Sequence, residues 1–194
     1  AEPRVTKRLL GAIEAKLDTT TAVIICDYSK GAVTQEILDG LRALCKPSGI
    51  WLSFDPKPAH QLDLAAMSLI TPNRGELFAL AGLPDEATEA SLNAAVTAVQ
   101  EKFEPAIMLV TLSEHGMLLC PRGENPTLIP TVAQEIYDVS GAGDTVIASF
   151  TLAISAGASP AEAAMFSNHA AGVVVGKMGT AVVTPRELSG SFYV

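Results

Sequence analysis

The residues with the clearest chemical potential are 138–145, whose sequence is DVSGAGDT. Gly141 and Gly143 flank Ala142, and the segment leads directly into an apolar stretch with helical spacing. Glycines at a helix start expose backbone N–H groups that, with the helix dipole, bind an anion. Asp144 follows in the first turn and is placed to take a proton from a hydroxyl group. A carboxylate beside an anion-binding turn is the combination that phosphoryl transfer requires.

Two better-known glycine motifs do not fit these residues. A dinucleotide-binding fingerprint needs glycine at position 146, where Val146 stands, and residues 172–177 are one residue short of a P-loop and close a predicted helix. Asp144 also has a structural alternative, because a first-turn carboxylate stabilises a helix by about 0.3–1 kcal/mol.

Polar side chains recur after four apolar segments of the chain. Each apolar segment is short and rich in β-branched residues, which is typical of buried parallel strands. The polar segments that follow them are 27–31 (DYSKG), 55–57 (DPK), 72–76 (PNRGE) and 111–116 (TLSEHG). Because ligands of open α/β sheets bind beyond the carboxyl ends of the strands, this recurrence predicts a polar crevice at one sheet edge.

The elements that must position these residues alternate along the chain. Strands are predicted at 22–27, 50–55, 67–71 and 106–111, followed by a hairpin of 116–120 with 127–130. Helices are predicted at 8–17, 34–46, 74–81, 89–103, 142–155 and 160–175, with Thr34 as an N-cap and a capping box from Ser159 to Glu162. The alternation predicts an α/β fold of three layers, in which helices flank a mostly parallel sheet.

Composition excludes several classes of function. The net charge of −8 and the absence of any basic run argue against nucleic acid as a partner. The longest apolar stretch, 146–158, is too short to cross a membrane. The three cysteines are widely spaced and form no CxxC pair, which favours a reducing, cytoplasmic setting.

With these residues in place, the chain resembles the ribokinase-like (pfkB) carbohydrate kinases. DVSGAGDT is similar to the signature of that family, TPNRGE (71–76) to its N-x-x-E motif, and VTLSEHGM (110–117) to its nucleotide-binding strand and turn. Within the family, CDYSKGAVT (26–34), FDPK (54–57) and AAGVVVGKMGTAVVTPREL (170–188) are most similar to the D-glycero-β-D-manno-heptose-7-phosphate kinases, which supply activated heptose for lipopolysaccharide.

The resemblance implies a kinase that transfers phosphate from ATP to a hydroxyl of a sugar or sugar phosphate, here heptose 7-phosphate at its anomeric hydroxyl. It implies that Asp144 is the base and that the amides of Gly141, Ala142 and Gly143 form the anion hole. The remaining implied contacts, to phosphate, Mg²⁺ or nucleotide, are Lys57, Asn73, Glu76, Thr111, Ser113, Gly116 and Asn168. Asn73 and Glu76 would hold Mg²⁺ through water, and Asn168 would lie near the adenine. A monovalent cation is a further implied cofactor and a homodimer a further implied assembly.

Several of these residues have structural alternatives. Asn73 and Glu76 have the spacing of a helix N-cap and its N3 partner. Lys57 is equally typical of a solvated loop charge, and Asn168 of a buried polar residue bonded within helix packing. Ser113 stands where many members of the family have glycine.

The length of 194 residues bears on the completeness of the site. Members of the family are longer, with an N-terminal region that binds the acceptor and a small β lid. The chain is therefore expected to be one α/β domain over 1–194, the C-terminal nucleotide-binding part, without that region and lid. We expect such a part to bind ATP or ADP weakly, to phosphorylate no sugar at a useful rate, and to self-associate through exposed apolar surface. Another sugar or nucleoside kinase, or a nucleotide-binding module without catalysis, remains the alternative.

Overall fold

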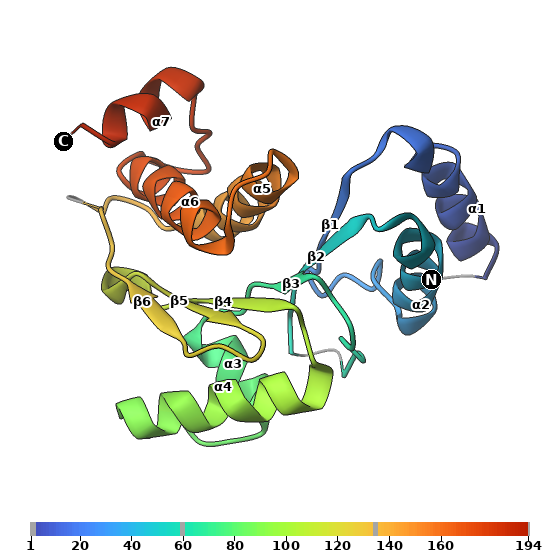
Figure 1. Cartoon of the computed structure of the whole chain (residues 1–194), viewed down its shortest axis with the longest axis horizontal. Coiled ribbons are helices and arrows are strands. Elements are labelled where there is room, and N and C mark those ends of the chain that lie inside the picture. The colour runs from blue at the N-terminus through green and yellow to red at the C-terminus, as the bar shows by residue number, and fades with distance from the viewer. Residues whose placement is uncertain (1–2, 59–60, 134–135, 194) are drawn as a thin grey trace.

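A six-stranded sheet runs through the centre of the protein in the computed structural model, which describes residues 3–58, 61–133 and 136–193 (Figure 1). The strands follow one another across the sheet in chain order, and the first four are parallel. The last two run antiparallel to their neighbours, so the sheet is mostly parallel, as predicted. The strands are β1 (Ala22–Cys26), β2 (Trp51–Asp55), β3 (Leu69–Ile70), β4 (Ile107–Thr111), β5 (Met117–Pro121) and β6 (Thr127–Ile129).

Helices cover both faces of this sheet and make a three-layer α/β fold (Figure 1). One apolar core joins the sheet to α2 (Gln35–Cys45), α3 (Arg74–Ala81) and α4 (Glu89–Phe103), with α1 (Pro3–Glu14) packed against α2. A second core joins the other face to α5 (Ala142–Ser155) and α6 (Pro160–Val175), and α7 (Pro185–Ser191) packs on α6. Three short 3₁₀ turns complete the elements: η1 (Leu17–Thr19), η2 (Lys46–Ser48) and η3 (Ser113–His115). Within the described residues, no helix has the length and apolar character that a membrane span needs.

Local capping explains why most helix limits agree with the sequence. The predicted bounds of α3, α4, α5 and α6 are those of the structure. Thr34 accepts a hydrogen bond from the Ile37 N–H, and Ser159 forms the predicted capping box with Glu162. Helix α7 was not predicted, although Thr184 and Glu187 form a capping box at its start. The strand predicted at 67–71 is only two residues long, and the helix predicted at 8–17 begins and ends earlier.

The prediction that strand 22–27 is buried was wrong. Within the described part of the chain, strand β1 pairs with β2 alone and forms one edge of the sheet. Ile25 is its one buried residue, whereas the Ile24 side chain is 40% exposed. The β-branched run therefore indicated the strand correctly, but its burial depends on a neighbouring strand that a local pattern does not specify.

The approach of β6 to the start of β5 provides a test of the fold. Gly116 has a φ of +92°, and a Cβ there would lie 2.1 Å from the Ile129 carbonyl oxygen. We expect Gly116→Ala to lower the free energy of unfolding by about 2–4 kcal/mol, since backbone strain and overlap add. Gly123→Ala, at a φ of +80° with open space around it, is the matched control and should cost only about 1 kcal/mol. If urea denaturation gave equal losses of unfolding free energy for Gly116→Ala and Gly123→Ala, the close approach of β6 to Gly116 would be contradicted.

Candidate functional site

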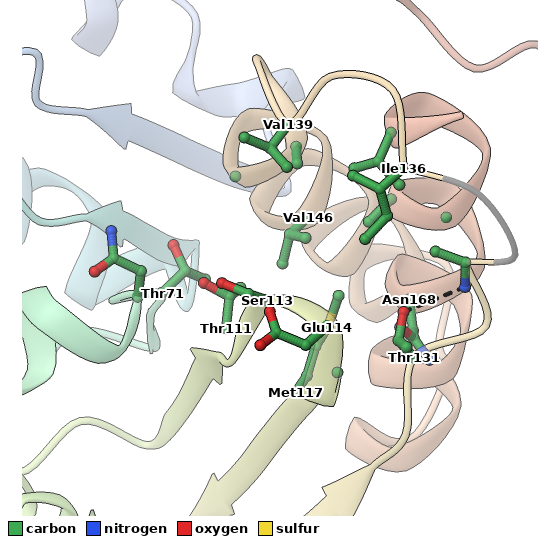
Figure 2. Close-up of a pocket in the computed structure, with 18 of the residues that line it drawn as sticks. Thr71, Thr111, Ser113, Glu114, Met117, Thr131, Ile136, Val139, Val146 and Asn168 are labelled. Carbon is green, nitrogen blue, oxygen red and sulfur yellow. Dashed lines mark hydrogen bonds between the residues drawn. The ribbon is translucent and has the colours of Figure 1, made fainter. Parts of the chain in front are cut away.

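A cavity of about 590 Å³ lies where the carboxyl ends of β2, β3 and β4 face the start of α5 (Figure 2). Its polar end is lined from the strand ends by residues such as Asp55, Thr71 and Thr111. Its other end is apolar and is lined by residues such as Ile136, Val139 and Val146, which Figure 2 shows on the helical side. The crevice expected at this sheet edge is therefore present and has two chemically distinct ends.

Most of the predicted site residues meet in this cavity. Those that line it are Lys57, Asn73, Glu76, Thr111, Ser113, Gly116, Ala142, Gly143 and Asn168. Gly141 and Asp144 are not among the lining residues. Gly141 is the N-cap of α5, and the Asp144 side chain is directed to the end of β1, where Tyr28 Oη donates a hydrogen bond of 2.8 Å to Asp144 Oδ1.

Glu76 connects a helix cap to a lysine. Asn73 Oδ1 accepts from the Glu76 N–H at 2.9 Å, and Glu76 Oε2 accepts from the Asn73 N–H at 2.8 Å, so the capping alternative is realised. The other carboxylate oxygen, Oε1, lies 2.5 Å from Lys57 Nζ. Burial lowers the pKa of Lys57, but Glu76 and the Asp55 charge raise it more, and the net direction is upward. Lys57 is therefore held in an ion pair and is not a freely solvated loop charge.

Asp55 also lines the cavity, although it was not among the predicted site residues. It is 6% exposed, accepts a hydrogen bond of 3.3 Å from Thr71 Oγ1, and its carboxylate lies 3.6 Å from Lys57 Nζ. Burial raises its pKa to about 6, the Lys57 charge opposes the rise, and the charges of Glu76 and Asp144 add to it. Its position could have indicated this place, because Asp55 is the last residue of an apolar strand and stands two residues before Lys57.

The start of α5 leaves room for a ligand. Gly141 adopts a left-handed conformation, and Asp138 stabilises the turn by accepting from the N–H groups of Ser140 and Gly179. The Ala142 N–H donates to the Val139 carbonyl, so this predicted anion donor is engaged within the turn. The Gly143 N–H belongs to the first turn and has no acceptor within the helix, and a Cβ there would meet no atom within 4 Å. Gly143 thus leaves the space beside the first turn of α5 free of a side chain, and it lines the cavity.

Three other predicted residues have evident structural roles. Asn168 Nδ2 donates a 2.7 Å hydrogen bond to the Pro130 carbonyl, which fits the alternative of a buried residue bonded within the packing. Gly116 permits the close approach of β6. Ser113 has a φ of +53°, a left-handed conformation that favours glycine. Each of the three also lines the cavity.

A three-layer α/β fold with a glycine-led helix start at the carboxyl ends of its parallel strands agrees with the ribokinase-like fold that the resemblance implied. Residues 5–187 match the model of the pfkB family carbohydrate kinases, and the chain belongs to this family. The resemblance stated from the DVSGAGDT and TPNRGE segments is confirmed.

Solved structures confirm the fold. The chain superposes with a TM-score of 0.80 on Arabidopsis thaliana ribokinase complexed with ribose and ATP, at 23% identity, covering 96% of this chain and 59% of that one. With phosphofructokinase-2 from Escherichia coli in complex with potassium, the TM-score is 0.81 at 19% identity, covering 97% and 61%.

Curated relatives are closer in sequence. The chain is 40% identical to the bifunctional protein HldE of Sulfurimonas denitrificans, over 93% of this chain and 37% of that protein. It is 41% identical to the bifunctional protein HldE of Edwardsiella ictaluri, over 94% and 38%. The chain thus spans less than two-fifths of the length of these relatives.

The buried Asp55 carboxylate predicts a pH-dependent stability. Its pKa of about 6 exceeds the ordinary value of 3.8, so the folded protein holds a proton that the unfolded chain releases between these values. The stability from this group is present below about pH 4 and is lost as the pH rises through about 6. Asp55→Asn should therefore gain melting temperature relative to the wild type between about pH 4 and pH 8, with the exposed Asp18→Asn as control. Thermal melts in which the Asp55→Asn difference stays constant across this range would contradict the assignment.

Proposed function

We propose that this protein is an ATP-dependent sugar kinase that phosphorylates heptose 7-phosphate at its anomeric hydroxyl. The observation that carries the proposal is the start of α5, where Gly143 lines the cavity without a side chain and directly precedes Asp144 in the first turn. The homology to the bifunctional HldE proteins at about 40% identity supports the heptose substrate. Another sugar or nucleoside kinase of the family is the alternative.

The two ends of the cavity suit the two ends of a nucleotide. The apolar end offers Val139, Val146 and Ala171 to a flat base, and the polar end offers Thr111 to the sugar and phosphates. Gly143 lines the cavity without a side chain to fill it. The first turn of α5 also borders the cavity, and its backbone N–H groups and the helix dipole would stabilise the negative charge of a terminal phosphate.

The donor set at the polar end also suits Mg²⁺. This ion is usually held by one or two carboxylates together with substrate phosphates, and Asp55 and Glu76 supply such oxygens. Among residues 3–58, 61–133 and 136–193, no three acidic, histidine or cysteine side chains form a metal cluster by themselves. When bound, Mg²⁺ would neutralise phosphate charge. Because Glu76 is engaged by Lys57 and by the α3 cap, its contact to the ion would run through water, as the resemblance implied.

The reaction requires one proton transfer from the acceptor. In the proposed step, the Asp144 carboxylate takes the proton of the sugar hydroxyl, whose oxygen bonds to the γ-phosphorus. The bond from that phosphorus to the β–γ bridging oxygen breaks, and its electron pair leaves with ADP. The Gly143 N–H stabilises the charge on the transferred group, and Lys57 approaches the phosphates from the other side of the cavity.

The function is tested on the protein at its natural length, by coupled assays over a panel of sugars and sugar phosphates. We expect heptose 7-phosphate to be phosphorylated in preference to fructose or ribose. Asp144→Asn should lower kcat by about 10²–10⁴-fold, because it removes the general base, and should leave ATP affinity nearly unchanged. Phosphorylation of fructose or ribose but not of heptose 7-phosphate would overturn the substrate assignment. If Asp144→Asn kept almost full kcat, Asp144 would not be the base and would only stabilise the start of the helix by its charge.

A further inference from the structure

One hydrogen bond joins the proposed base to a residue 116 positions away in the sequence. Tyr28 Oη donates to Asp144 Oδ1 at 2.8 Å. Tyr28 lies two residues beyond the end of β1, whose last residue, Cys26, also lies near this carboxylate. Burial raises the pKa of the Cys26 thiol to about 11, and the Asp144 and Asp55 charges add to the rise. The carboxylate of Asp144 is thus contacted from the end of β1 by groups that keep their protons at neutral pH.

This bond is poorly explained as a contribution to folding. The Tyr28 side chain is 58% exposed, and Asp144 is exposed as well. A hydrogen bond in contact with water adds little net stability, because both groups are solvated when it breaks. Its clear physical consequence is orientation, because a carboxylate in the first turn of a helix otherwise samples several rotamers.

The chemistry of Tyr28 suits an orienting donor. The hydrogen bond to Asp144 is the main cause that raises the pKa of the phenol to about 12, and the phenol therefore remains a donor at neutral pH. Tyr28 neither takes nor gives a proton in the proposed reaction. It binds one carboxylate oxygen, Oδ1, through the proton that it keeps.

We propose that Tyr28 is a positioning residue, whose phenol O–H holds the Asp144 carboxylate in the orientation from which it takes the proton of the acceptor hydroxyl. The proposal rests on the proposed function, since it gives Asp144 the role of base. It adds that the end of β1 contributes to the catalytic geometry, although the glycine-rich turn lies more than a hundred residues away in the sequence.

The kinetic test compares Tyr28→Phe with Tyr193→Phe, which removes a phenol hydroxyl at an 88% exposed position. On the protein at its natural length, Tyr28→Phe should lower kcat by about 10- to 100-fold, the scale of a misplaced catalytic group, with the KM for ATP unchanged. In an Asp144→Asn background, Tyr28→Phe should cost nothing further, because the group that it positions is already inactive. An unchanged or increased kcat in Tyr28→Phe, or an equal loss in both backgrounds, would overturn the proposal.

A spectroscopic measurement tests the bond without activity. The absorbance of phenolate is followed through an alkaline titration, and Tyr28 is assigned from the difference between the wild type and Tyr28→Phe. Asp144→Asn should bring the Tyr28 pKa down from about 12 toward its ordinary value of 10. If this pKa did not change, the hydrogen bond from Tyr28 to Asp144 would be absent in solution and the proposal would be overturned. If Asp144→Asn itself kept full kcat, the proposed function would fail instead, so the two failures are distinguishable.

Discussion

Helix α5 packs on the sheet through the buried side chains of Ile147 and Phe150 and through a buried hydrogen bond of 2.7 Å between Thr151 Oγ1 and Ser53 Oγ of β2. This contact joins residues 98 positions apart and fixes the helix against the strand that ends at Asp55. The first turn of α5 is therefore placed beside the carboxyl ends of the parallel strands. The dipole of the helix and the polar strand ends converge on one cavity because of this packing.

The charges in the cavity impose a second constraint. Asp55 and Glu76 bring two carboxylates to the polar end, and the ion pair with Lys57 offsets only part of their charge. The pKa of Asp55 is raised because a buried carboxylate beside a second negative charge is unfavourable. A polyphosphate that entered alone would meet this negative charge. Entry together with a divalent cation would neutralise it, which is why we place Mg²⁺ and the phosphates at the same end.

Local sequence signals predicted much of this structure. Capping residues such as Ser159 and Asn73 fixed helix starts, and the glycines at 141 and 143 indicated the helix start that opens on the cavity. Features that depend on tertiary packing were missed. The hydrogen bond from Tyr28 to Asp144 spans 116 residues and has no local signature. The engagement of the Ala142 N–H depends on the detailed turn geometry, which residue types alone do not specify.

The central claim is that the first turn of α5 binds the phosphates of a nucleotide, and calorimetry with ADP and Mg²⁺ tests it directly. The informative variant is Gly143→Ala, because a Cβ there meets no protein atom within 4 Å and alanine favours a helix more than glycine does. A lower affinity cannot then be attributed to unfolding. Gly11→Ala in α1, which also has open space, is the control. We predict binding by the wild type and Gly11→Ala and a loss of about tenfold or more in Gly143→Ala. Equal affinities in all three proteins, or no binding by the wild type, would contradict the account.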